Sequence, residues 1–211
     1  VSIMQNNPYA AFNNNVLNFI NLLKVSTSFG VSNIIQVSTD KAAEPSNIMG
    51  FSKLLCEQIL IHANKHLVTG FKYSIVRFGN VVGSSGSVVP IFIENIKNRN
   101  KLSVTHDEVE RFMMQIGDAV SLILRAASHR KNETYILDMG EPYKILDLAV
   151  KMLNNSHFHH DKNLIEFTGL QDGEKLTEVL FTVLESTDIT KQDGVFVIPD
   201  RDDSFLSEKE L

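Results

Sequence analysis

The sequence has a single cysteine, no tryptophan and no long hydrophobic run in its 211 residues. Cys56 cannot form an intrachain disulfide, which is typical of a protein from a reducing compartment such as the cytoplasm. No stretch reaches the roughly 18 apolar residues that a membrane-spanning helix needs, so we expect no membrane segment in this chain. The first residues lack the basic and apolar regions of a signal peptide. Position 1 is Val rather than Met, which suggests that the chain begins within a longer protein.

The sequence also lacks an excess of positive charge. It has 20 Lys and Arg residues against 25 Asp and Glu residues, for a formal net charge of −5. This balance excludes the basic footprint of a protein that binds nucleic acid or an anionic membrane surface. The chain is long enough to bury a core without disulfides or structural metals. We therefore expect a globular protein with no nucleic-acid partner.

Helix and strand patterns alternate in the first part of the chain. Apolar residues at three- and four-residue spacing predict helices over residues 9–29 and 49–66. Residues 34–37 and 73–78 have the short, apolar, β-branched pattern of buried strands. The succession over residues 34–78 predicts a βαβ unit with parallel strands, and hence an α/β fold. We expect further helices over 88–98, 117–128 and 145–153, strands over 134–137, 164–167 and 195–198, and polar segments over 154–163 and 200–211.

The densest polar cluster follows the first predicted strand. Ser38, Thr39, Asp40 and Lys41 combine two hydroxyls, a carboxylate and an amine. Ligands of open α/β sheets bind at the carboxyl ends of the strands. Adjacent Asp and Lys side chains can donate and accept protons when their surroundings suit. A surface turn with a solvated ion pair is the alternative interpretation.

Other polar residues carry weaker signals. Met49 and Lys53 are four residues apart and lie on one face of the second predicted helix, where a lone Lys is usually a solvated charge. The segment Gly83–Ser87 could bring backbone amides close to phosphates, or it could be a flexible surface loop. The dinucleotide fingerprint Gly-x-Gly-x-x-Gly and the Walker loop are both absent.

We expect no metal site. His62 and His66 have the spacing of metal ligands on a helix, but the His-Glu-x-x-His pattern is not met. A solvated face, and a solvated loop for His157, His159 and His160, are the better interpretations. Cys56 lies within a predicted helix and is expected to be a buried, inert thiol.

Several segments in the same order resemble one known family. The longest is residues 37–53, Val-Ser-Thr-Asp-Lys-Ala-Ala-Glu-Pro-Ser-Asn-Ile-Met-Gly-Phe-Ser-Lys. It resembles the signature of the polysaccharide-biosynthesis (CapD-like) branch of the extended short-chain dehydrogenases/reductases, which contains nucleotide-sugar 4,6-dehydratases and epimerases. Further matching segments are residues 77–81, 83–90, 104–106, 111–113, 138–142, 144–149, 168–170 and 173–176.

The resemblance implies the C-terminal part of a Rossmann-like parallel sheet with a smaller α+β substrate-binding region. Residues 1–82 would form the second half of an NAD(P)-binding domain, with NAD or NADP as the cofactor. Residues 83–211 would form a nucleotide-sugar-binding region interleaved with it. The family also implies a UDP-sugar substrate and a homo-oligomer. The expected location is the cytoplasm, although family members can be anchored at the inner face of the membrane.

The resemblance also implies roles for individual residues. Asp40 would protonate the leaving C6 hydroxyl of the sugar, Lys41 would remove the C5 proton, and Thr39 would hydrogen-bond the C4 oxygen. A Lys at that position suits dehydratases that invert C5. Lys53 would bind the nicotinamide ribose, with Ser38 and Phe78 also contacting the cofactor.

Substrate-binding and supporting residues follow from the same motifs. The nucleotide-sugar would be held by Asn80, Ser87, Val88, Arg111 and Glu174. Arginine can hold a phosphate group through two hydrogen bonds. Asn15 resembles the structural asparagine that supports this kind of active site.

The chain departs from the family pattern at three places. Met49 stands where most short-chain dehydrogenases have the catalytic tyrosine, and a thioether cannot exchange protons. Long, membrane-anchored dehydratases of this branch also resemble the chain in having Met there. Gln171 and Asp172 replace the family's usual Arg-Pro, which removes a positive charge. The fingerprint strand and glycine loop, which would seat the cofactor pyrophosphate on a helix N-terminus, would precede Val1.

We therefore expect a UDP-sugar 4,6-dehydratase, most simply one for UDP-N-acetylglucosamine, acting in bacterial surface polysaccharide or glycan biosynthesis, in truncated form. One alternative is a nucleotide-sugar epimerase of the same branch. The other is a non-catalytic remnant that lacks the cofactor site.

Overall fold

A computed structural model describes residues 1–67, 70–157 and 162–200 of the chain. These residues form two compact units that are interleaved along the sequence. Unit 1 comprises Val1–Phe78, Val120–Asp138 and the described residues from Val179 onward, and unit 2 comprises Gly79–Ala119 and Met139–Glu178. The functional division at residue 82 stays a prediction. Parts of the expected polar segments, residues 158–161 and 201–211, lie outside the described residues.

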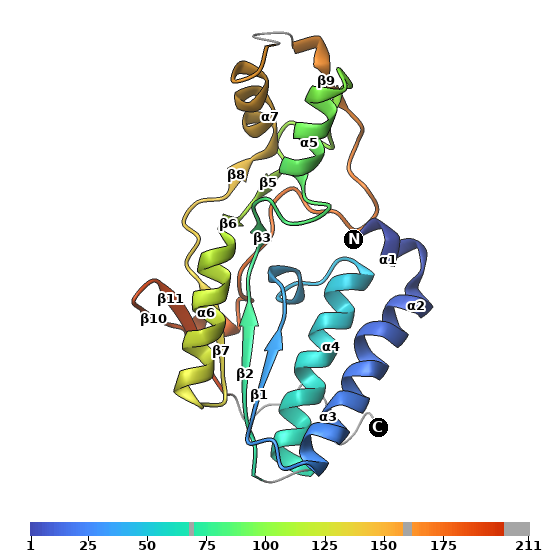
Figure 1. Ribbon diagram of the computed structural model, residues 1–211. Coiled ribbons are helices and arrows are strands. Elements are labelled where there is room, and N and C mark those ends of the chain that lie inside the picture. The colour runs from blue at the N-terminus through green and yellow to red at the C-terminus, as the bar shows by residue number, and fades with distance from the viewer. Residues whose placement is uncertain (68–69, 158–161, 201–211) are drawn as a thin grey trace. The chain divides into compact units, whose positions relative to one another are not determined.

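A mixed sheet of five strands forms the centre of unit 1 (Figure 1). The strand order is β1 (Asn33–Val37), β2 (Lys72–Arg77), β7 (Glu133–Leu137), β11 (Val195–Pro199) and β10 (Thr190–Gln192). β1, β2 and β7 are parallel, with Ile34 opposite Tyr73 and Val76 opposite Tyr135. The predicted parallel βαβ unit and the α/β class are therefore confirmed. β10 and β11 add an antiparallel hairpin at the far edge.

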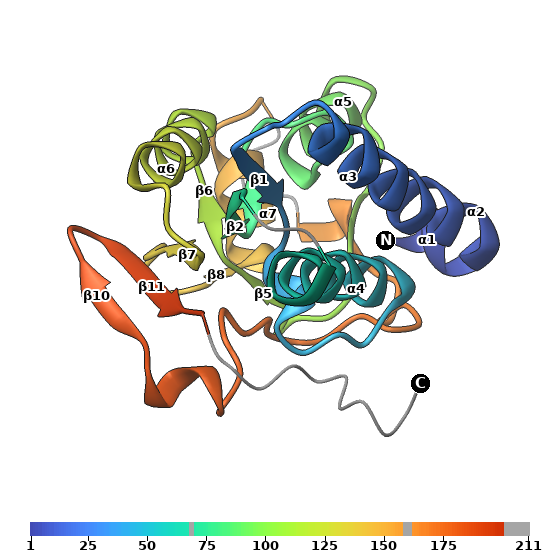
Figure 2. The same cartoon turned by 90° about the horizontal axis from the view of Figure 1, so that it is seen from below.

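Helices cover both faces of this sheet (Figures 1 and 2). One face carries α3 (Asn18–Ser28) and α4 (Ile48–His62), and the other carries the part of α6 (Ile116–His129) that belongs to unit 1. The predicted helix over 9–29 is present as α2 (Pro8–Phe12), a π-helical segment η1 (Asn13–Leu17) and α3, and α1 (Ser2–Asn6) precedes them. A second π-helical segment, η3 (Ala63–Leu67), extends α4 to about the predicted end.

The alternation of side chains along β2 explains why both faces are covered. Ile75 packs with Cys56 and Leu60 of α4 in one core cluster, whereas Val76 packs with Leu122 of α6 in another. Successive residues of a strand point to opposite faces, so an apolar strand needs a cover on each side. β2 is buried along all but its first residue, as expected of an inner strand.

The start of α4 is packed unusually closely against the turn that follows β1. Asn47 caps the helix, since its side-chain oxygen accepts a hydrogen bond of 2.9 Å from the Gly50 N–H. Gly50 faces the backbone carbonyl of Lys41, and a Cβ atom at this position would overlap that oxygen. The packing therefore requires glycine at position 50.

Unit 2 is built from three short strand pairs and two helices. The pairs are β3 (Asn80–Val81) with β6 (Met113–Met114), β4 (Leu102–Val104) with β9 (Ile165–Phe167), and β5 (Glu110–Arg111) with β8 (Tyr143–Lys144). The helices α5 (Val88–Lys97) and α7 (Ile145–Asn154) contribute Phe92 and Ala149 to the core of the unit, where they pack with Leu102. Short helical turns complete the described chain: η2 (Asp40–Ala42), η4 (Lys162–Leu164) and η5 (Glu185–Thr187).

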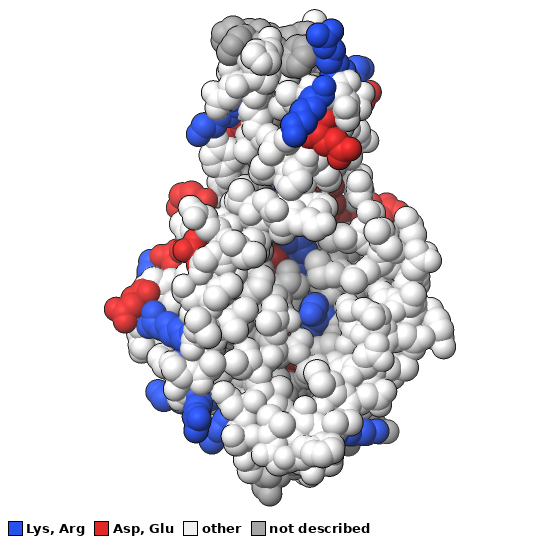
Figure 3. Space-filling model, in the orientation of Figure 1, with Lys and Arg blue, Asp and Glu red and all other residues white. Residues whose placement is uncertain are grey.

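Charged side chains of both signs are scattered over the face shown in Figure 3, and most of that surface is uncharged. Within the described residues, no helix is long and apolar enough to cross a membrane.

Substitution of Gly50 by alanine tests the close packing of α4. We expect Gly50→Ala to lower the free energy of unfolding by about 1–3 kcal/mol, because the new methyl group overlaps the Lys41 carbonyl. Urea unfolding followed by circular dichroism measures the change. Gly117→Ala is the matched control, since a Cβ at this α6 position meets no atom within 4 Å. Equal stability of the two variants would contradict the packing argument.

Candidate active site

The turn after β1 holds the predicted proton-transfer residues in a defined conformation. The Ser38 and Asp40 N–H groups donate to the carbonyls of Val76 and Phe78, at 2.8 and 3.2 Å, so the backbone stays paired beyond the end of β1. Thr39 then caps η2, because its hydroxyl oxygen accepts from the Lys41 N–H at 3.4 Å. The cluster therefore lies at the carboxyl end of β1, where the sequence pattern places it.

Asp40 and Lys41 form a buried ion pair. Lys41 Nζ lies 2.9 Å from Asp40 Oδ1, and the Thr39 hydroxyl donates to the same oxygen at 2.9 Å. The Asp40 residue is only 1% exposed. Its second oxygen, Oδ2, is buried and has no hydrogen-bond partner in the described part of the chain. A buried polar atom without a partner is costly, and such atoms occur at functional sites. The surface-turn interpretation, a solvated ion pair, is therefore wrong.

Met49 and Lys53 lie on the first turns of α4. Lys53 Nζ donates to the carbonyl of Val37 at 3.1 Å, which places the ammonium beside the end of β1. An ammonium has three hydrogens, so this contact leaves donors for a ligand such as a ribose hydroxyl. The contact of Lys53 with a nicotinamide ribose stays a prediction. The sequence offers no Gly-x-Gly-x-x-Gly loop for the pyrophosphate end.

A charged network that the sequence patterns do not reveal lies beneath the turn. The Ser38 hydroxyl donates to Glu57 Oε1 in a very short hydrogen bond, and Arg77 binds the same carboxylate through Nε at 3.0 Å and Nη2 at 2.6 Å. Arg77 also binds Glu185 through Nη1 at 2.8 Å. The two carboxylates raise the pKa of Arg77 despite its burial. Two features of the sequence could have revealed this network: a charged residue, Glu57, on an apolar helix face, and another, Arg77, within a buried strand.

The Ser38 hydroxyl is thus directed toward Glu57, and the predicted contacts of Ser38 and Phe78 with a cofactor stay predictions. Phe78 is partly buried and packs against the α6 side of the sheet.

Asn15 connects the first helical segments to α4. It lies within η1, and its Nδ2 donates to the Ser52 hydroxyl at 2.8 Å, one residue before Lys53. The Cys56 thiol lies 3.3 Å from the Asn15 carbonyl oxygen. π-Helical turns are rare and occur frequently at functional sites. The contacts agree with a supporting position for Asn15.

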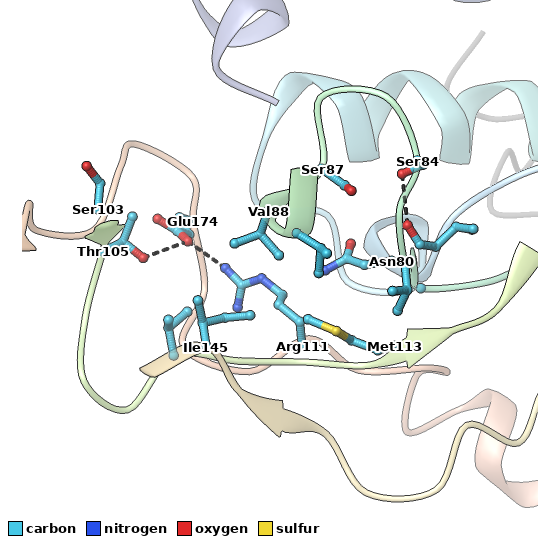
Figure 4. A pocket seen from close by; sticks show the side chains of 15 residues that line it. Asn80, Ser84, Ser87, Val88, Ser103, Thr105, Arg111, Met113, Ile145 and Glu174 are labelled. Atoms are coloured by element: carbon cyan, nitrogen blue, oxygen red, sulfur yellow. Dashed lines mark hydrogen bonds and ion pairs between the residues drawn. The ribbon is translucent and has the colours of Figure 1, made fainter. Parts of the chain in front are cut away.

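Unit 2 contains a pocket of about 500 Å³ that is lined by all five predicted substrate-binding residues (Figure 4). It also includes Ser103 and Thr105, which the sequence predictions did not name as site residues. The Ser87 hydroxyl is buried and has no partner among the described residues. Its lining includes Asn80, Ser87, Val88, Ser103, Thr105, Arg111 and Glu174.

Arg111 and Glu174 form an ion pair of 2.6 Å in this pocket. Arg111 Nη1 also donates to the backbone carbonyls of Glu110, Lys175 and Leu176, at 2.7, 3.0 and 3.1 Å. The Glu174 carboxylate accepts further hydrogen bonds from the Thr105 hydroxyl and from the Gln171 N–H, at 3.0 and 3.1 Å. Arg111 therefore holds the segment around Glu174 against β5.

A larger cavity of about 1200 Å³ in unit 1 contains none of the predicted site residues. Its walls are mostly apolar side chains of α2 and α4, and Glu57, Arg77 and Glu185 contribute a polar part.

The two histidines with the spacing of metal ligands, His62 and His66, lie on α4 and η3. The rings of His62 and His66 are 4.8 Å apart, and no group of three or more potential ligands occurs among the described residues. His157 is exposed, whereas His159 and His160 lie outside the described residues.

Most of the chain matches a known family. Residues 1–200 match the family described as "Polysaccharide biosynthesis protein". The chain belongs to this family. The probable polysaccharide biosynthesis protein EpsC of Bacillus subtilis is 39% identical over 181 residues, which are 85% of this chain and 30% of EpsC. The UDP-glucose 4-epimerase of Rickettsia akari is 36% identical over 197 residues, which are 91% of this chain and 56% of the epimerase.

Solved structures of the family's fold are similar to the described chain. Pen from Bacillus thuringiensis has a TM-score of 0.87 and 32% identity, and the match covers 95% of this chain and 62% of Pen. The second structure is DesIV of Streptomyces venezuelae, a dTDP-glucose 4,6-dehydratase with NAD bound. It has a TM-score of 0.75 and 19% identity, and the match covers 85% of this chain and 61% of the DesIV chain. The second likeness shows the fold alone. The chain thus spans between about a third and two thirds of the length of these relatives.

Cys56 is buried in the folded protein, with 1% of its surface exposed. Burial raises the pKa of the Cys56 thiol from 9.0 to about 11. At about pH 8, we therefore expect a chromogenic aromatic disulfide to label one thiol per chain in urea and none on the same timescale in the native protein. The pKa is raised in the folded state, so this group's contribution to stability falls as the pH rises from 9.0 to about 11. Rapid labelling of the native protein would contradict the buried position.

Proposed function

We propose that the protein acts as the catalytic part of a UDP-sugar 4,6-dehydratase with inversion at C5, and that its substrate is UDP-N-acetylglucosamine. The reaction would serve bacterial surface polysaccharide or glycan biosynthesis. The observation that carries the proposal is the buried Thr39-Asp40-Lys41 cluster, in which Asp40 Oδ2 has no partner among the described residues.

The Asp40–Lys41 pair can supply both the acid and the base that dehydration needs. Elimination of water across C5 and C6 requires removal of the C5 proton and protonation of the leaving C6 hydroxyl. Because Lys41 Nζ and Asp40 Oδ1 are hydrogen-bonded at 2.9 Å, one proton transfer between them converts the ion pair into a carboxylic acid and a neutral amine. Lys41 then accepts the C5 proton, and Asp40 donates to the C6 oxygen. Thr39 would orient the C4 oxygen.

The family uses NAD(P), which when bound would supply the redox chemistry, with a hydride removed from C4 and returned at C6. The proton of the C4 hydroxyl would pass to Asp40, water or another group, and water or a side chain would supply the proton that C5 gains when the hydride returns. Lys53 would hold the nicotinamide ribose, in agreement with its place beside the end of β1. The uncharged Met49 thioether takes no part in proton transfer.

The pocket of unit 2 would hold the nucleotide part of the substrate. The unpartnered Ser87 hydroxyl and the Asn80 amide offer donors for phosphate oxygens, whereas the charge of Arg111 is balanced by the Glu174 carboxylate. Its size and its mixed apolar and polar lining suit a nucleoside diphosphate.

A nucleotide-sugar 4-epimerase is the second candidate, favoured by the 36% identity to the epimerase of Rickettsia akari. An epimerase also transfers a hydride at C4, but it forms no 4-keto-6-deoxy sugar. The third candidate is a non-catalytic chain that binds a nucleotide-sugar but does not turn it over.

Dinucleotide content and product analysis separate these functions. One sample of the purified chain is denatured, and its NAD(P) content is measured. A second, native sample is supplied with NAD or NADP and then with UDP-N-acetylglucosamine. We expect a dinucleotide-dependent UDP-4-keto-6-deoxy sugar, detected by mass spectrometry. A C4 epimer without this product would favour the epimerase. Absence of both dinucleotide binding and turnover would contradict catalysis by this chain.

Asp40→Asn tests the proposed acid. We expect the rate of dehydration to fall by a factor of about 10² or more, since the amide cannot donate the proton. Binding of UDP, measured by calorimetry, should be unchanged because Asp40 does not line the pocket of unit 2. Glu94→Gln, at an exposed position of α5, is the control for the loss of one carboxylate. Unchanged turnover of Asp40→Asn would rule out the acid role.

A further inference from the structure

We propose that Glu57 is a positioning residue for the Thr39-Asp40-Lys41 segment and acts through the hydroxyl of Ser38. The inference rests on the proposed function of that segment. Glu57 lies on α4 and belongs to the buried network of Ser38, Arg77 and Glu185 in unit 1.

The contact between Glu57 and Ser38 has a defined direction. A carboxylate can only accept hydrogen bonds, so the Ser38 hydroxyl must donate to Glu57 Oε1. Both residues are buried, at 1% and 4% exposure, and water therefore does not compete for either group. The hydrogen bond holds the Ser38 side chain toward α4.

The Ser38 contact anchors the backbone next to Thr39. Thr39 has extended backbone angles, with φ of −145° and ψ of 155°. Neighbouring side chains on extended backbone point to opposite sides, so Ser38 lies toward α4 and the Thr39 side chain lies on the other side of the backbone. From that position the Thr39 hydroxyl donates to Asp40 Oδ1, the oxygen that also binds Lys41.

Glu57 is itself held in place on its other side. Arg77 contacts both carboxylate oxygens, with Nη2 2.6 Å from Oε2 and Nε 3.0 Å from Oε1. Arg77 is bound in turn by Glu185, whose Oε2 accepts from the Thr182 N–H at 2.7 Å. The chain of contacts therefore runs from η5 through β2 and α4 to the turn after β1.

The charge count indicates a role for Glu57 beyond pairing with Arg77. Glu185 alone would neutralise the guanidinium, yet a second carboxylate is buried beside it. Burying an additional charge is unfavourable unless its contacts offset the loss of hydration. The contact that Glu57 makes and Glu185 does not make is the one to Ser38.

The test measures how readily Lys41 is acetylated, without cofactor or substrate. The full chain is treated with limiting acetic anhydride, and peptide mass spectrometry gives the rate for Lys41 relative to exposed Lys101. The variants are Ser38→Ala, Glu57→Ala, Glu57→Gln and Glu185→Gln. Thermal unfolding of each is recorded, and labelling is done at a temperature at which all are folded.

We expect two separate effects. Ser38→Ala leaves both ion pairs of Arg77 intact, so it should raise the relative rate for Lys41 by between about twofold and tenfold, as the loss of one hydrogen bond implies, with little change in melting temperature. Glu57→Ala should raise the rate at least as much and also lower the melting temperature. Glu57→Gln keeps an acceptor for Ser38, so its rate should stay near that of the wild type although its stability falls. Glu185→Gln should lower the melting temperature without raising the rate.

A rate that follows melting temperature across the variants, or that is unchanged in Ser38→Ala, would overturn the proposal, because Glu57 would then act only on stability. The labelling result is independent of turnover. If the wild-type chain does not turn over UDP-sugar but the variants show the expected labelling pattern, the proposed function is rejected. The positioning of Lys41 by Glu57 then still stands.

Discussion

The buried ion pair of Glu57 and Arg77 is the interaction on which unit 1 depends. It joins α4 to β2, and through Ser38 and Glu185 it reaches the turn after β1 and the segment around η5. Removing one partner of such a pair costs about 3–5 kcal/mol. The total stability of a domain is only about 5–15 kcal/mol. The contacts that keep this unit folded are therefore the same contacts that hold the proton-transfer residues.

Two carboxylates of the protein illustrate opposite uses of a buried charge. Both oxygens of Glu174 are occupied, by Arg111 and Thr105 on one side and by the Gln171 N–H on the other. One oxygen of Asp40 is occupied and the other has no partner among the described residues. A satisfied carboxylate organises the backbone around it, whereas an unsatisfied one retains the capacity to bind a ligand or exchange a proton. The difference supports a structural position for Glu174 and a chemical one for Asp40.

Much of the fold could be predicted from the sequence, because its strongest signals are local. The periodicity of residues 49–66 and the β-branched residues of 34–37 and 73–78 correctly indicated the parallel βαβ unit. The strand predicted over 164–167 is present as β9, but the other short strands of unit 2 were missed, since two or three residues carry no usable period. The five residues that were predicted to bind the substrate came from the resemblance, and they line one pocket. Glu57, Arg77 and Glu185 could not be grouped in advance, because up to 128 positions separate them and only the folded chain brings them together.

The contact of Gly50 with the Lys41 carbonyl has a mechanical consequence. With no side chain between them, the start of α4 and the turn after β1 pack backbone against backbone, and we expect them to move together. Lys53 lies on the same helix, less than one turn further along. When thermal motion displaces α4, the amine proposed as the base and the ammonium proposed to hold the ribose are therefore carried together. The distance between these two side chains should therefore change little as the unit fluctuates, and a methyl group at position 50, by pushing the helix start away from the turn, would weaken this coupling.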